Sequence, residues 1–188
     1  MDSPGEKREI KMKNTILFWL LILIFIMTAK ATPLLAGDWE MFRHDPTHTG
    51  VSPDTGISLP LSLEAKCKLN GRLFSSPSIV NNVIYIGTFD GKSLYAMKYD
   101  EENMKWILKW KFATGQYIIS SPCVVNGIAY IGSCDWRIYA IDINTGTAIW
   151  EYETGNEIES SPVVSNGVVY IVSNDGYLYA LDASNGSM

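Results

Sequence analysis

The repeated stretch that decides the fold reads SSPCVVNGIAYIGSCDWRIYAID at residues 120–142, and similar stretches begin at Ser75 and Ser160. The intervals between the three starting serines are 45 and 40 residues. A tyrosine stands ten residues after each of these serines and an aspartate fifteen after it: Tyr85, Tyr130 and Tyr170, then Asp90, Asp135 and Asp175. The C-terminal part of the chain therefore consists of three copies of one unit of about forty residues.

Each copy alternates apolar and polar residues with period two, which is typical of antiparallel strands joined by short turns. In the second copy we expect strands over residues 118–125, 128–133, 137–142 and 148–153. Asparagine and glycine tolerate the positive φ that two-residue hairpin turns require. The first turns of the three copies contain these residues: Asn81-Asn82, Asn126-Gly127 and Asn166-Gly167. The next turn is Asp-Gly at Asp90 and Asp175, but the middle copy has Asp135-Trp136 there.

No helical periodicity follows Pro33. Units of about forty residues with four strands each are the signature of β-propeller blades. The expected fold class is therefore all-β, with about three blades, each a four-stranded antiparallel meander.

A second motif overlaps the end of the middle copy, where residues 140–150 read AIDINTGTAIW and match A-x-D-x-x-T-G-x-x-x-W. The matched positions are Ala140, Asp142, Thr145, Gly146 and Trp150. This stretch resembles the docking motif of propellers with the pyrroloquinoline quinone (PQQ) enzyme-like repeat. That family includes outer-membrane assembly propeller lipoproteins and quinoprotein dehydrogenases. The resemblance implies that Trp110 and Trp150 dock between neighbouring blades.

The resemblance is incomplete in the outer copies. The first copy has Cys67 where a tryptophan is expected before Ser-Ser-Pro, and the third copy stops at Met188 before its tryptophan. Residues 39–50 resemble the segment that commonly opens such propellers in exported proteins.

These patterns divide the chain into a lead-in segment at residues 32–60 and a partial propeller at 61–188. The repeats occupy about residues 71–112, 115–153 and 155–188, and residues 61–69 resemble a fourth strand without a blade of its own. Closed propellers use about four to eight blades, so this ring is incomplete. Two possibilities stay open: the chain is a fragment of a longer propeller protein, or chains associate to complete a ring. The expected partner is accordingly another protein or additional blades.

The N-terminus resembles an export signal. Residues 16–27 are an unbroken apolar run that follows Lys11 and Lys13 and precedes small residues ending at Ala31. As a helix the run is roughly 18 Å long, shorter than the roughly 30 Å hydrocarbon core of a membrane. We expect a signal peptide over residues 1–31, with an uncleaved anchor at 16–27 as the alternative and Met12 as an alternative start. The predicted location is extracytoplasmic or at the cell surface, and contact with a membrane would come only through this segment.

Composition excludes two further classes. Lysine and arginine number 15 against 20 aspartate and glutamate, for a net charge of −5, and the clustered basic residues of a nucleic-acid-binding face are missing. Three cysteines cannot supply a disulfide framework, so packing and sheet hydrogen bonds must hold the fold together.

The resemblance to quinoproteins raises the question of a PQQ site. In the family such a site needs a calcium ion held by carboxylate and amide oxygens, a catalytic aspartate, an aromatic floor and often an adjacent cysteine pair. Here the repeated aspartates fall at turn positions, where such side chains satisfy backbone amides. Cys123 and Cys134 are not adjacent, and the Asn126-Gly127 turn places Cys123 opposite Tyr130. We therefore predict no catalytic, cofactor-binding or metal-binding residues, and PQQ with calcium only under the quinoprotein alternative.

Other candidate groups also have plainer interpretations. His44 and His48 could bind a metal, but Pro46 between them indicates an extended segment. The Ser-Ser-Pro hydroxyls have no histidine base in a matching position, so we expect them to line the channel structurally. The glycosylation pattern at Asn185-Gly186-Ser187 coincides with the docking-motif turn, and the repeated tyrosines fit packing between blades.

Export, repeats and the lack of a catalytic set favour an exported, non-enzymatic scaffold for protein interaction or assembly. One alternative is a fragment of a PQQ-dependent quinoprotein oxidoreductase. Another is the extracytoplasmic sensor domain of a membrane protein, which would need the apolar run to stay uncleaved.

Overall fold

The computed structural model describes residues 40–42 and 65–188. The predicted signal segment, both histidines and most of the lead-in segment lie outside these residues. Every feature below lies within the unit Gly37–Met188. None of the described residues belongs to a helix that could cross a membrane.

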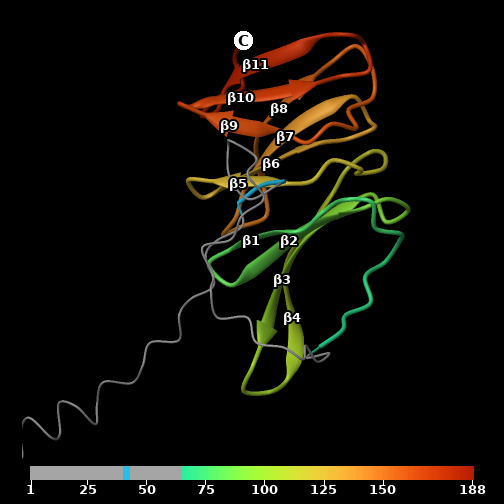
Figure 1. The fold of residues 1–188 in the computed structure, drawn as a ribbon, viewed down its shortest axis with the longest axis vertical. Helices are drawn as coiled ribbons and strands as arrows, with labels where there is room; N and C mark the ends of the chain where they lie inside the picture. Colours follow the sequence, from blue (N-terminus) through green and yellow to red (C-terminus); the bar gives the residue numbers. More distant parts are fainter. Residues whose placement is uncertain (1–39, 43–64) are drawn as a thin grey trace, which may run out of the picture. The chain divides into compact units, whose positions relative to one another are not determined.

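The described residues form three antiparallel sheets that follow one another along the chain (Figure 1). The first contains β1 (Ser78–Val80), β2 (Val83–Thr88), β3 (Ser93–Asp100) and β4 (Lys105–Ala113). The second contains β5 (Cys123–Val125), β6 (Ile128–Gly132), β7 (Arg137–Asp142) and β8 (Ala148–Glu153). The third contains β9 (Val163–Ser165), β10 (Val168–Val172) and β11 (Leu178–Asp182). Consecutive strands pair in chain order, so the expected all-β fold of propeller-type meanders is confirmed for these residues.

The inner hairpins form as their sequences predict. Asn126 and Gly127 have φ values of 52° and 80°, and Asn166 and Gly167 have 50° and 77°. These left-handed pairs give the tight turn that matches strand twist. The resulting register places Cys123 opposite Tyr130, as expected.

One inner strand is shorter than predicted. β5 begins at Cys123 instead of residue 118, because Pro122 has no N–H to donate to a ladder. The preceding serines bond elsewhere: Ser120 Oγ accepts from Gly132 N–H at 3.2 Å, and Ser121 N–H donates to Ser161 Oγ at 2.9 Å. β6 likewise ends at Gly132, one residue early. In residues 65–69, the described part of the strand expected over 61–69, no strand forms.

The core lies between sheets. One buried cluster joins the first sheet to the second through residues such as Leu94, Ala96, Ile131 and Ile141. Another joins the second sheet to the third, and it includes Met41, which is fully buried. Val124 N–H donates to Glu40 O at 2.7 Å, so residues 40–42 lie beside β5. The sequence alone gave no indication that Met41 would enter this core.

Candidate functional site: the connector face

The loops of the blades gather at two ends of the strands. We call one end the connector face. It contains the turn between the second and third strands of each blade, at residues 89–92, 134–136 and 174–177. It also contains the segments that precede the first strand of each blade, at residues 71–76, 114–118 and 154–158. Hydrogen bonds tie these loops together, for example Gly115 N–H to Asp135 Oδ2 at 2.6 Å and Gly155 N–H to Asp175 Oδ2 at 2.7 Å. The opposite end, which we call the hairpin face, contains the turns between the first and second strands and between the third and fourth strands of the blades.

Tryptophans of the docking motif join each blade to the next. The indole N–H of Trp110 on β4 donates to Ile143 O at 2.7 Å, and that of Trp150 on β8 donates to Ala183 O at 3.0 Å. Gly146 has a φ of 72°, and a Cβ built there would lie 2.6 Å from Trp110 Cγ. The motif glycine therefore permits both the turn and the close approach of the indole ring.

The other motif residues build the turn that receives the indole. Asp142 Oδ1 accepts from the backbone N–H groups of Asn144 and Thr145 at 2.8 and 2.9 Å. These bonds hold the pKa of the Asp142 carboxyl below its usual value. Ala140 is fully buried in the sheet, opposite Trp150 in register. These residues therefore form the turn through which one blade contacts the preceding one.

A second set of contacts runs through the Ser-Ser-Pro repeats. The backbone N–H of Ser76 donates to Ser121 Oγ at 2.9 Å, and that of Ser121 donates to Ser161 Oγ at the same distance. The first serine of each copy bonds within its own blade, as Ser75 Oγ does in accepting from Gly87 N–H. The first serine of each pair therefore stabilises its own blade, and the second takes part in the contact with a neighbouring blade.

The repeated aspartates hold the turns and connections. Asp135 accepts from Arg137 N–H, Gly115 N–H and the Tyr139 hydroxyl. Asp175 repeats this pattern with Tyr177, Gly155 and Tyr179. Asp90 instead pairs with the Arg72 guanidinium at 2.8 and 2.9 Å, which lowers the pKa of the Asp90 carboxyl.

The three cysteines lie in different surroundings. Cys123 and Cys134 are free and buried, and Cys67 is free and exposed. Burial raises the pKa of the Cys123 thiol to about 12 and that of Cys134 to about 11. Among residues 40–42 and 65–188, no three histidine, cysteine or acidic side chains converge as metal ligands.

Tyrosines of the repeat lie in different surroundings. Tyr85 and Tyr130 are 2% exposed, and each packs its ring against the docking tryptophan of its own blade at 5.8 to 5.9 Å. The Tyr130 hydroxyl also donates to Ala183 O in the next blade. Tyr170 is 39% exposed.

The connector face also exposes large aromatic side chains. Phe74, Tyr117, Trp136 and Tyr177 are 58, 36, 47 and 66% exposed. The ring of Phe89 lies between Tyr117, stacked at 4.2 Å, and the guanidinium of Arg72, 4.8 Å away. Sequence reasoning did not select this surface, although Trp136 is visible as a departure from the Asp-Gly turns of the other copies.

A hollow of about 500 Å³ opens in this surface. It is lined by Gly115, Gln116, Tyr117, Cys134, Asp135, Trp136 and Glu157. We call it the Trp136 hollow. Because its walls come from two blade connections and one turn, its shape depends on how neighbouring blades dock.

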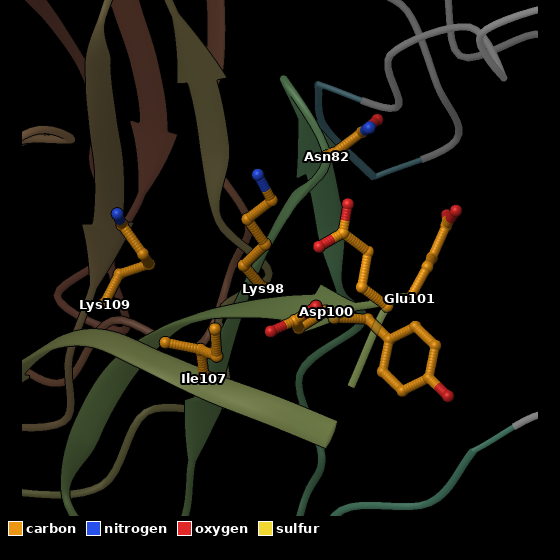
Figure 2. A pocket seen from close by; sticks show the side chains of 8 residues that line it. Asn82, Lys98, Asp100, Glu101, Ile107 and Lys109 are labelled. Carbon is orange, nitrogen blue, oxygen red and sulfur yellow. The ribbon is translucent and has the colours of Figure 1, made fainter. Parts of the chain in front are cut away.

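A second hollow, of about 480 Å³, lies at the hairpin face of the first blade. Figure 2 shows its charged lining, which includes Lys98, Lys109, Asp100 and Glu101. The charged insertion near Asp100 lengthens β3 and β4 to eight and nine residues, against six each for β7 and β8. This hollow therefore belongs to an extension that the other blades lack.

Comparison with known proteins agrees with this architecture. Residues 106–188 match the family model described as outer membrane protein assembly factor BamB. Similar solved structures include BamB from Moraxella catarrhalis, with a TM-score of 0.53 and 21% identity over 62% of this chain. This family match and the similar solved structures are consistent with repeats of the PQQ-like propeller type. The resemblance stated from the docking motif is thereby confirmed.

Solved structures of two dehydrogenases are also similar to this chain. A europium-containing methanol dehydrogenase has a TM-score of 0.64 at 20% identity, and quinohemoprotein alcohol dehydrogenase ADHIIG from Pseudomonas putida HK5 has 0.67 at 24%. Each comparison covers 80% of this chain. The chain spans 31% and 26% of those two proteins and 35% of the Moraxella BamB. No curated protein matches the sequence significantly.

Proposed function

We propose that this chain is part of an exported, non-enzymatic PQQ-like propeller whose connector face binds another protein. The observation that carries the proposal is the exposure of Phe74, Tyr117 and Trp136 on one set of loops, beside Arg72. Aromatic residues and arginine are enriched where protein partners bind most strongly. Contiguous exposed apolar surface on a soluble protein marks such sites.

The remaining architecture supports a scaffold. Docking tryptophans and paired serines fix one blade against the next, and the repeated aspartates are occupied in turns and connections. A rigid frame of this kind can present loops to a partner without reorganising them. The similarity to an outer membrane protein assembly factor agrees with such a role and with an extracytoplasmic location.

Site-specific photo-cross-linking tests the proposal. A photoreactive phenylalanine derivative replaces Tyr177 on the connector face in one variant and Ala148, exposed at the start of β8, in the other. In intact cells of the source organism, we expect a discrete protein adduct from position 177 and little from 148. Equal adducts from both positions, or none from 177, would contradict a partner on the connector face.

The second candidate function is a fragment of a PQQ-dependent quinoprotein oxidoreductase. It is favoured by the two dehydrogenase structures, which cover 80% of this chain against 62% for the Moraxella BamB. The test is titration of the full chain with PQQ and calcium, followed by absorbance. The scaffold proposal predicts no saturable change, whereas saturable, calcium-dependent binding would favour the oxidoreductase.

A sensor domain of a membrane protein would need the run at residues 16–27 to remain attached. The mass of the mature chain distinguishes this case from cleavage near Ala31.

A further inference from the structure

We propose that the Trp136 hollow binds an arginine side chain from a partner protein. This inference rests on the proposed function, because it assigns one specific contact to the protein-binding connector face. It names the chemical group that the hollow fits, a guanidinium cation presented on an exposed segment.

The aromatic walls of the hollow suit a cation. Trp136 is 47% exposed, and among the described residues its indole ring stacks on no other ring and its indole N–H has no acceptor. Tyr117 already attracts a cation, because the ammonium of Lys92 lies 5.7 Å from its ring centre. Indole is the best aromatic partner for a cation, and the planar guanidinium of arginine stacks on it more readily than an ammonium does.

Acidic groups surround the same space. Asp135 and Glu157 line the hollow, and together with Glu159 they raise the pKa of the Cys134 thiol beyond the effect of burial. The Asp135 carboxylate is bonded to Gly115 and Tyr139, and Glu159 accepts from the Asn174 side chain at 3.3 Å. The carboxylate of Glu157 has no ion pair or hydrogen bond within residues 40–42 and 65–188. It is therefore available to an incoming guanidinium.

The basic side chains near the hollow have partners of their own, as Arg137 does with Glu151 and Glu153. Lys92 Nζ donates to Gly115 O at 3.4 Å, and Arg72 is paired with Asp90. The lining thus presents two carboxylates, Asp135 and Glu157, and no cationic side chain of its own. Charge complementarity selects a cationic occupant, and a guanidinium can combine stacking on Trp136 with a charge-assisted bond to Glu157.

The backbone at Trp136 also departs from the repeat. Its φ is 73°, a conformation that bulky residues rarely adopt, whereas the third copy has Gly176 at the corresponding place with φ 92°. The substitution Trp136→Gly therefore keeps a turn that this fold already uses. It removes the aromatic wall with little risk to folding.

A binding experiment with blocked tetra-arginine tests the proposal. The full chain is titrated at low ionic strength and followed by the indole N–H resonances in NMR spectra. Blocked tetra-citrulline, a neutral analogue of nearly the same shape, is the ligand control. Tyr177→Ala is the matched protein control, because Tyr177 is an exposed aromatic outside the lining.

We expect saturable binding of tetra-arginine to the unaltered chain and to Tyr177→Ala. The affinity for tetra-arginine should fall about tenfold in Trp136→Gly and about threefold in Glu157→Gln. The unaltered chain should bind tetra-citrulline at least about tenfold more weakly than tetra-arginine. Glu157→Gln keeps the test decisive even if Trp136→Gly unfolds, because the change is nearly isosteric. Equal binding of citrulline and arginine, no binding, or undiminished binding in both lining variants would overturn the proposal.

The two proposals can fail separately. If tetra-arginine does not bind but position 177 still forms a discrete cross-link, only the arginine site is wrong. If tetra-arginine binds as expected and no cross-link forms, the hollow is a cation site but the connector face is not a protein-docking surface.

Discussion

The indole N–H of Trp110 donates a 2.7 Å hydrogen bond to the carbonyl oxygen of Ile143, 33 residues later and in the next blade. Trp150 repeats this bond with Ala183, again 33 residues later. The equal spacing means that the joint between blades is encoded in the repeat itself. Consecutive blades therefore stabilise each other through the same pair of elements, the outer strand of one blade and the third turn of the next blade.

Replacing Trp110 by phenylalanine should weaken this joint. The aromatic ring can still pack against Tyr85, but the hydrogen bond to Ile143 is lost. We expect the free energy of unfolding, measured with urea, to fall by about 1 kcal/mol. Trp136→Phe is the control, because the Trp136 side chain is exposed, and it should change stability by less than about 0.5 kcal/mol. Equal effects of the two changes would contradict the claim that the Trp110 hydrogen bond stabilises the contact between blades.

Gly146→Ala should destabilise more than Gly127→Ala. Both glycines have positive φ, 72° and 80°, so alanine costs about 1 kcal/mol of backbone strain at either position. Only at Gly146 would the new Cβ also meet Trp110, at 2.6 Å, whereas nothing lies within 4 Å at Gly127. The difference between the two unfolding free energies, about 1 to 3 kcal/mol, measures this clash. Indistinguishable values would mean that Trp110 does not pack on the turn.

Ser121→Ala should weaken the contact between the first two blades. The change leaves the Ser76 backbone N–H without the acceptor that Ser121 Oγ provides at 2.9 Å. Losing the partner of a partly buried donor costs about 1 to 3 kcal/mol. Faster amide hydrogen exchange at Ser76 is the direct readout. Ser76→Ala is the control, since no inter-blade bond to the Ser76 hydroxyl occurs among the described residues, and unaltered exchange in Ser121→Ala would refute the link.

Alkaline pH should destabilise the fold. Burial raises the pKa of Cys123 from 9.0 to about 12 and that of Tyr130 from 10.0 to about 12. The folded chain therefore holds these protons more tightly than the unfolded chain. Their stabilising effect is fully present below about pH 9 and is lost progressively as the pH rises toward 12. The urea midpoint should fall over this range and fall less steeply in Cys123→Ala, while Cys67→Ala, at an exposed thiol, keeps the original slope.

Much of the fold follows from the sequence because its signals are local. β7 and β8 coincide with the strands expected over residues 137–142 and 148–153, since alternation and turn residues mark both ends of each. The predicted length of the inner strand β5 was too great, because the hydrogen bonds of Ser120 and Ser121 depend on other segments of the chain. The burial of Met41 likewise depends on a segment distant in sequence.

The candidate site was less predictable. Exposure of Tyr117 and Trp136 results from how blade connections lie over the neighbouring turn, which no periodicity reveals. The one available signal was tryptophan in place of glycine after Asp135. Such a local departure from an otherwise consistent repeat is where functional constraints are expected.

The most direct test of the account is the yield of the position-177 cross-link in cells that produce the chain with or without Trp136→Gly. We predict a discrete protein adduct with the unaltered residue and its loss in the variant, while circular dichroism shows the same β-sheet content in both. An adduct of unchanged yield in Trp136→Gly would contradict the claim that this exposed aromatic face holds the partner.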